Sequence, residues 1–331
     1  YDGTSANYTG MLGMHGTKTS NLGVSECDLL IAIGVRFSDR VFGNPKKFAK
    51  QAKILQIDID PVEINKNIIV NHSIVGDVAI VLNILNEKLG KQSHTEWLSH
   101  IAEYQKQYPL TFPKEGLSGP FMIAKIYEMA KDAIMVTEVG QHQMWASQYL
   151  KLDATHRLVQ SGGLGTMGFG LPSAVGAQIG CPEKSVVSIS GDGGFQMNMQ
   201  ELATAVCQEL PLVNIVFNNN RLGMVRQMQE LFFKKRYTIT CLRYHKSCKG
   251  KCGTPGWVCP EYVPDFVKMA EAYGSKGYFV TSNDQLKDTI LEAREYAEKN
   301  KKPVIVECMV APDELVMPMI KGGASFEDIM L

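Results

Sequence analysis

The sequence predicts an α/β fold in which doubly wound parallel sheets form two domains. Short apolar runs, such as 29–35 and 213–217, have the length of buried strands, and helical patterns such as 78–89 alternate with them along the chain. Alternation of this kind is typical of parallel sheets that are covered by helices. The chain has 331 residues, which is enough for about two domains of ordinary size.

The first domain is expected at 1–90, with strands at 25–35 and 53–59 and a helix at 78–89. Residues 91–117 are polar and contain several Pro and Gly, so we expect a linker there, with one short helix at 97–108. The second domain is expected at 118–331. Its expected helices are 121–131, 171–180, 200–209, 265–273 and 283–300, and its expected strands are 133–138, 185–190, 212–217, 277–280 and 304–310.

Composition argues against two classes of partner. Lys plus Arg and Asp plus Glu number 34 each, whereas nucleic acids and anionic membrane surfaces attract proteins with an excess of basic residues. The apolar runs are also far shorter than the ~20 residues that cross a bilayer. We therefore expect no nucleic-acid and no membrane partner.

The start of the chain gives two further expectations. No signal-peptide pattern opens it, which favours a cytoplasmic location. It begins at Tyr1 within a glycine-rich stretch, which we interpret as the start of a fragment.

Polar residues follow two strands of the second domain. Gly191-Asp192-Gly193 comes after strand 185–190, and Asn218-Asn219 comes 24 residues later, after strand 212–217. The carboxyl ends of parallel strands are where open α/β sheets bind ligands. The Asp192 carboxylate, the Asn219 amide oxygen and a main-chain carbonyl from Arg221 are oxygen ligands of the kind that Mg²⁺ prefers. Each piece alone is more often a turn or a loop, but together they predict a site for Mg²⁺ and a diphosphate, because glycines let backbone N–H groups face phosphate.

Six stretches carry a resemblance to the acetohydroxyacid (acetolactate) synthases, a family of thiamine-diphosphate enzymes. They are 11–16, 34–41, 57–61, 139–145, 162–170 and 218–225. The resemblance implies a partial FAD-type middle domain at 1–90 and a thiamine-diphosphate (PP) domain at 118–331. It also implies that the reaction joins pyruvate to pyruvate or 2-ketobutyrate, the first common step of branched-chain amino acid synthesis.

By this resemblance, a set of residues binds thiamine diphosphate, and Met167 holds the cofactor in a bent conformation. The set is Val139, Gly140, Gln141, His142, Gly162, Gly165, Met167, Gly191, Asp192, Gly193, Gly194, Asn219, Leu222, Gly223 and Met224. The implied ligands of Mg²⁺ are Asp192, Asn219 and Arg221. A second set contacts FAD, which is structural because the reaction has no redox step. This set is Met14, His15, Gly34, Arg36, Ser38, Arg40, Val41, Asp58, Ile59, Gly76 and Asp77.

The resemblance also implies what lies outside this sequence. The family's activating Glu belongs to an amino-terminal domain of the partner subunit, and no Glu here matches it, so we expect no catalytic residue in this fragment and little activity from it alone. Expected partners are small 2-keto acids, further copies in a homodimer or tetramer, and a regulatory small subunit. Two alternatives are another thiamine-diphosphate carboligase or decarboxylase, resembling glyoxylate carboligase, and a non-catalytic thiamine-diphosphate binding module.

Two features depart from the family pattern. An insert carries Cys241, Cys248, Cys252 and Cys259, which could hold Zn²⁺ or an iron–sulfur cluster, remain reduced thiols or form disulfides. Met228 stands where the family commonly has a Trp in the substrate channel. Met offers no flat aromatic face, which predicts weaker selection of 2-ketobutyrate over pyruvate, unless Met228 fills the same volume.

Overall fold

The computed structural model describes residues 2–113, 116–153, 157–246, 248, 259 and 264–331. Its internal contacts divide the chain into two compact units. The first, here called the six-stranded unit, contains Phe112–Leu315 and the N-terminal residues up to Thr4. The second, the three-stranded unit, contains Ser5–Thr111 and Val316–Leu331.

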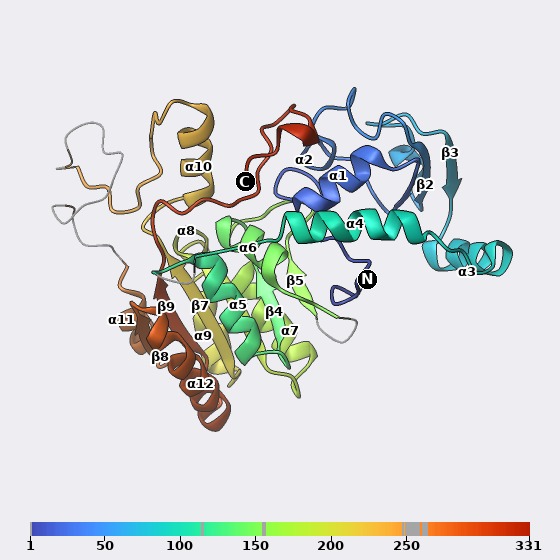
Figure 1. Ribbon diagram of the computed structural model, residues 1–331. Coiled ribbons are helices and arrows are strands. Elements are labelled where there is room, and N and C mark those ends of the chain that lie inside the picture. The colour runs from blue at the N-terminus through green and yellow to red at the C-terminus, as the bar shows by residue number, and fades with distance from the viewer. Residues whose placement is uncertain (1, 114–115, 154–156, 247, 249–258, 260–263) are drawn as a thin grey trace. The chain divides into compact units, whose positions relative to one another are not determined.

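The three-stranded unit is a parallel sheet with strand order β1 (Leu29–Ile33), β2 (Lys53–Asp58) and β3 (His72–Val75) (Figure 1). Its helices are α1 (Lys18–Glu26), α2 (Asp39–Phe42), α3 (Val78–Leu89) and α4 (Thr95–Gln107), with 3₁₀ turns at Pro61–Glu63 and Phe326–Asp328. Helix α3 begins where predicted because the Asp77 carboxylate accepts hydrogen bonds from the N–H groups of Ala79 and Ile80.

The C-terminal residues pack in the three-stranded unit. Phe48 stacks edge-on between Phe37 and Phe326, with 5.8 Å between ring centroids on each side. The N–H of Ile320 donates to the carbonyl of Met14 at 2.8 Å. The compact units therefore differ from the expected division into 1–90, 91–117 and 118–331, because buried aromatic contacts bring 316–331 to the three-stranded unit and α4 belongs to that unit too. As domain boundaries, those limits stay a prediction.

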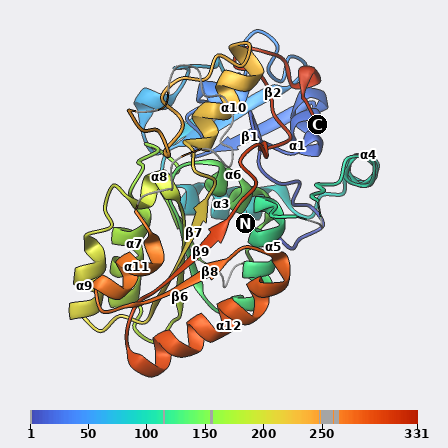
Figure 2. The ribbon, with the colours of Figure 1, turned by 90° about the vertical axis from the view of Figure 1, so that its left-hand side faces the viewer.

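The six-stranded unit is a fully parallel sheet with the order β5 (Leu158–Gln160), β4 (Ile134–Thr137), β6 (Val186–Gly191), β7 (Leu212–Asn218), β9 (Val304–Met309) and β8 (Lys276–Val280). Its helices are α5 (Gly119–Met129), α6 (Gln141–Tyr149), α7 (Gly170–Gly180), α8 (Asp192–Phe195), α9 (Glu201–Cys207), α10 (Gly223–Phe232), α11 (Phe266–Ala272) and α12 (Asn283–Asn300). Helices α7 and α11 cover one face of the sheet, and α5 and α12 cover the other (Figure 2). The predicted doubly wound α/β class is confirmed.

The strand order places a ligand site in this sheet. From β4 the chain moves outward to β5 and then returns to β6 on the other side of β4, so the winding direction reverses between β4 and β6. Open α/β sheets bind ligands at such a reversal, beyond the carboxyl ends of the strands. Every residue of β7 is buried, so the carboxyl end of this strand is fixed in the core.

Candidate functional site

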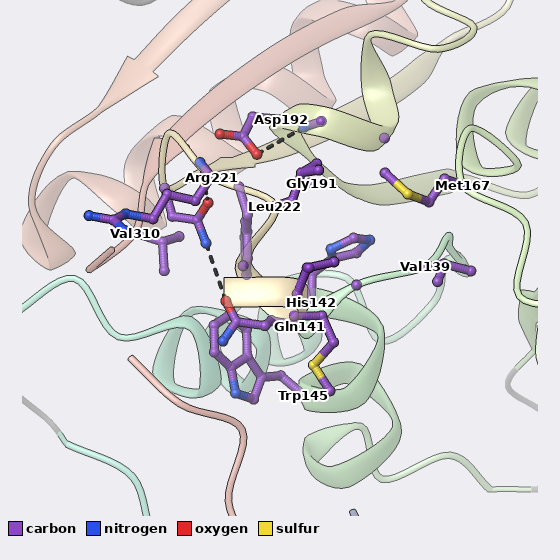
Figure 3. Close-up of a pocket in the computed structure, with 18 residues that line it drawn as sticks. Val139, Gln141, His142, Trp145, Met167, Gly191, Asp192, Arg221, Leu222 and Val310 are labelled. Carbon is purple, nitrogen blue, oxygen red and sulfur yellow. Dashed lines mark hydrogen bonds between the residues drawn. The ribbon is translucent and has the colours of Figure 1, made fainter. Parts of the chain in front are cut away.

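A cavity of about 250 Å³ lies at the carboxyl ends of β4, β6 and β7 (Figure 3). Three loops and helix starts build it: 139–142 after β4, 191–194 after β6 and 219–224 after β7. The residues of the predicted cofactor and metal sets that line it are Val139, Gly140, Gln141, His142, Met167, Gly191, Asp192, Gly193, Gly194, Asn219, Arg221, Leu222, Gly223 and Met224.

Asp192 is the buried carboxylate of this cavity, with 2 % of its surface exposed. Its Oδ1 accepts a hydrogen bond from the N–H of Gly193 at 2.9 Å, and its Oδ2 is buried without a hydrogen-bond partner. Burial raises the pKa of Asp192 to about 8. A buried carboxylate oxygen that lacks a partner is the kind of atom that a bound cation satisfies.

Asn219 and Arg221 add oxygen donors beside Asp192. The Oδ1 of Asn219 accepts a hydrogen bond from the N–H of Arg221 at 3.0 Å, and its Nδ2 donates to Oε1 of Gln141 at 3.2 Å. The backbone of Arg221 is held in place by an antiparallel bridge to Cys241. A carboxylate, an amide oxygen and a nearby main-chain carbonyl form a donor set that fits Mg²⁺.

His142 faces the glycine loop after β6. A Cβ on Gly191 would lie 3.1 Å from its ring. Burial lowers the pKa of His142 to about 3, so the ring is neutral, and its Nε2 is buried without a hydrogen-bond partner. A neutral imidazole carries one N–H donor. Next to the N-terminus of α6, whose N–H groups also attract anions, such a donor suits a phosphate oxygen.

Glu138 packs against glycines of the site, and the sequence analysis did not single it out. This fully buried residue accepts a hydrogen bond at Oε2 from the N–H of Gly168, 2.5 Å away. Burial raises its pKa to about 7. A Cβ on Gly194 would lie 2.1 Å from Glu138 Oε1, so only glycine fits there. The signal available in the sequence was a carboxylate placed directly before the 139–142 loop.

The structure separates some residues of the predicted cofactor set. Gly162 and Gly165 lie in the turn after β5 and do not line the cavity, whereas Met167 at the end of the same loop does. Side chains that the sequence did not single out complete the wall. They are Trp145, Phe217, Val225 and Val310. Trp145 is 2 % exposed and packs against α5, where a Cβ on Gly119 would lie 2.2 Å from its ring.

Two protein-family models match the chain. The C-terminal thiamine pyrophosphate (TPP) binding domain of thiamine pyrophosphate enzymes matches 138–308, which contains all three cavity loops, and the central domain of the same enzymes matches 1–85. The chain belongs to the thiamine pyrophosphate enzymes. The metal and diphosphate positions predicted from strand ends thus fall in the part of the family that binds the cofactor.

Individual relatives are acetolactate synthases. The acetolactate synthase large subunit of Porphyra purpurea is 41% identical over 324 residues, which is 96% of this chain and 51% of the relative. The isozyme 2 large subunit of Escherichia coli K12 is 39% identical over 329 residues, or 98% and 55%. Acetolactate synthase of Mycobacterium leprae is 41% identical over 330 residues, or 97% and 50%. The predicted resemblance is confirmed, and the chain spans about half the length of the curated relatives it matches.

The predicted FAD residues of this thiamine pyrophosphate enzyme lie in the three-stranded unit, mostly at strand ends. Gly34 follows β1, Asp58 ends β2, and Gly76 follows β3. Asp77 uses its carboxylate to cap α3.

Two of the predicted FAD residues, Met14 and Arg40, are joined by a backbone hydrogen bond of 2.8 Å. His15 is buried, and its pKa is lowered to about 4 by burial. The remaining members lie close to these along the chain; they are Arg36, Ser38, Val41 and Ile59.

The two departures from the family pattern are only partly described. Met228 lies half-buried on α10 and does not line the cavity. Cys241, Cys248 and Cys259 are half-buried, and Cys252 lies outside the described residues. Within the described part of the chain, no three His, Cys, Asp or Glu side chains are placed to hold a metal. The Zn²⁺ or iron–sulfur site therefore stays a prediction. None of the described helices is long and apolar enough to cross a membrane.

Proposed function

We propose that this chain supplies the diphosphate- and metal-binding half of an acetolactate synthase active site. The observation that carries the proposal is the cavity at the β4–β6 reversal, where the partnerless Oδ2 of Asp192 and Nε2 of His142 are both buried. The sequence identity to acetolactate synthases supports the substrate class, which is pyruvate with pyruvate or 2-ketobutyrate.

The residues of the cavity would divide the work between cation and anion. Asp192, Asn219 and the Arg221 carbonyl would hold Mg²⁺, and the N–H groups of the 139–142 and 191–194 loops would face the diphosphate. When bound, thiamine diphosphate supplies the electron sink that decarboxylation of a 2-keto acid requires. Met167, Leu222 and Met224 present apolar surface, which excludes water from the reacting end of the cavity.

Further parts of the proposal concern groups outside this cavity. We propose that the activating Glu is supplied by another domain of a partner subunit. FAD, in a structural role, is proposed for the carboxyl edge of the three-stranded sheet. Some relatives are named large subunits, which supports a smaller regulatory partner. Assembly into a homodimer or tetramer remains part of the proposal.

The test is product formation by the protein that the complete reading frame encodes. Purified protein is incubated with pyruvate, thiamine diphosphate and Mg²⁺, and 2-acetolactate is measured, with each cofactor omitted in turn. We expect product only when both cofactors are present, and none from this chain alone. Glyoxylate as the preferred substrate would favour a different carboligase, and cofactor binding without any product would favour a binding module.

A further inference from the structure

Gln141 makes a set of contacts that its assigned place in the diphosphate loop does not explain. It is the first residue of α6 and is 5 % exposed. Its Nε2 donates to the backbone carbonyl of Glu314 at 2.8 Å and to Oε1 of Gln227 on α10 at 3.1 Å. Its Oε1 accepts from Nδ2 of Asn219 at 3.2 Å, a bond drawn as the dashed line that ends at Gln141 in Figure 3. All the ordinary donor positions of this amide are therefore used by protein partners.

These contacts fix which way the Asn219 amide points. A backbone carbonyl can only accept, so the atom of Gln141 that faces Glu314 must be its NH₂ group. The remaining atom is then Oε1, which accepts only from a donor, so the atom of Asn219 facing it must be Nδ2. The amide oxygen of Asn219 is thereby turned to the opposite side, where it accepts from the N–H of Arg221.

The carbonyl at the start of this chain of contacts is itself held firmly. The carboxylate of Glu314 accepts hydrogen bonds from Oγ of Ser118 at 2.7 Å and from the N–H of Gly119 at 2.6 Å. Both donors belong to the start of α5. The side chain of Glu314 thus fixes its own backbone, and the Gln141 amide is oriented by a rigid partner.

The contact between Gln141 and Asn219 is also enforced by close packing. A Cβ on Gly223 would lie 2.1 Å from Oε1 of Gln141 and 2.6 Å from Nδ2 of Asn219. No side chain larger than hydrogen fits beside this amide pair without displacing it. The start of α10 therefore lies directly against the two hydrogen-bonded amides.

We propose that Gln141 is a positioning residue for the metal site. The fixed carbonyl of Glu314 orients the Gln141 amide. The Gln141 amide in turn orients Asn219 and holds the Asn219 amide oxygen on the side where the metal would bind. This inference rests on the proposed function, because it takes Asn219 as a ligand of Mg²⁺. Partners that orient a metal ligand commonly change metal affinity by about 10–100-fold when they are removed. Gln141 acts on the cation through Asn219.

The experiment measures Mg²⁺ affinity at saturating thiamine diphosphate in the protein that the complete reading frame encodes. Tryptophan fluorescence reports binding, because Trp145 lines the cavity. Gln141→Leu keeps the approximate size of the side chain and removes both amide functions. Its control is Gln178→Leu, since Gln178 is also a buried glutamine that donates to backbone carbonyls, those of Cys181 and Lys184, but lies on α7 and does not line the cavity.

We expect Gln141→Leu to weaken Mg²⁺ binding by about tenfold or more, and excess Mg²⁺ to restore thiamine diphosphate binding. Gln178→Leu should bind Mg²⁺ like the wild type. Equal Mg²⁺ affinity in wild type and Gln141→Leu would overturn the positioning role, and so would a defect that excess Mg²⁺ cannot restore. If the wild type itself shows no Mg²⁺-dependent cofactor binding, the proposed function fails instead.

Discussion

Replacing Asp192 with asparagine should have opposite effects on the metal-free and the metal-bound protein. Asparagine keeps the shape of the side chain and the acceptor for the N–H of Gly193, but it carries no charge. In the metal-free protein the negative charge destabilises the folded state, because Oδ2 is buried without a partner. With Mg²⁺ bound, the same charge is the main attraction between the chain and the cation.

The size of the first effect follows from the pKa of Asp192. Burial raises this pKa from 3.8 to about 8, and each unit corresponds to about 1.4 kcal/mol. The raised pKa contributes stability that is fully present below 3.8 and is lost as the pH rises through about 8. Metal-free wild type should therefore lose at most about 6 kcal/mol of unfolding free energy across this window through Asp192. Asp192→Asn should lack this component.

The second effect has the opposite sign. Two unit charges 4 Å apart attract by about 4 kcal/mol at the effective dielectric constant near a protein surface. A loss of that size corresponds to roughly a thousandfold weaker binding. We therefore expect Asp192→Asn to bind thiamine diphosphate with Mg²⁺ roughly a thousandfold less tightly, and Asp192→Ala to abolish Mg²⁺-dependent binding.

Both effects are measured on the same preparations. Urea unfolding with a chelator, at pH 5 and pH 8, gives the metal-free stability, and fluorescence quenching by thiamine diphosphate at increasing Mg²⁺ gives the affinity. The wild type should become less stable relative to Asp192→Asn as the pH rises. A constant stability difference between the two pH values would refute the pKa argument, and an unchanged affinity would refute the metal assignment.

Four substitutions and one elemental analysis test further features of the molecule. Gly223→Ala should weaken Mg²⁺-dependent cofactor binding, because its Cβ would meet the Gln141 amide. Gly176→Ala lies in α7, and its Cβ would meet nothing within 4 Å. This second substitution should therefore raise the free energy of unfolding, measured with urea, by about 0.5–1 kcal/mol. The raised pKa of Glu138 favours its protonated form, so the wild type should lose stability as the pH rises from about 5 through about 7. Glu138→Gln should not show this loss. Parallel pH profiles of stability for the two proteins would contradict this prediction. Met228→Trp should increase incorporation of 2-ketobutyrate over pyruvate in a competition assay; an unchanged product ratio would refute the channel assignment. Elemental analysis of chelator-free protein should find about one metal ion for the 241–259 insert; four freely alkylated thiols without metal would refute it.

Local patterns were sufficient to predict most strands and several helices. The run 212–217 is apolar throughout and forms β7 at Leu212–Asn218, because a strand buried on both faces needs no alternation. Helix α12 at Asn283–Asn300 and helix α3 at Val78–Leu89 match their predicted limits, since helical periodicity and flanking polar residues mark both. The patterns missed β3 and β5, which are only four and three residues long.

The cavity itself was predictable because its main residues lie in short motifs at strand ends. What joins those motifs was not predictable, because the contacts depend on the tertiary fold. Gln141 and Glu314 are 173 positions apart, and no local pattern pairs them. Likewise, nothing around Phe326 indicates that it packs against Phe48. Such contacts depend on which apolar and polar faces meet after the strands have assembled.

The buried polar atoms without partners show how the fold is adapted to a ligand. Folded proteins leave few buried polar atoms unsatisfied, because each costs about 1–3 kcal/mol. Among the described residues, two such atoms lie just beyond the carboxyl ends of β4 and β6: Nε2 of His142 and Oδ2 of Asp192. The glycine at position 191 leaves room beside the His142 ring, since a Cβ there would lie 3.1 Å from it. Under the proposed function, an anion and a cation bound together would satisfy the imidazole donor and the carboxylate acceptor at once, so a magnesium diphosphate would fit this strand edge better than either ion alone.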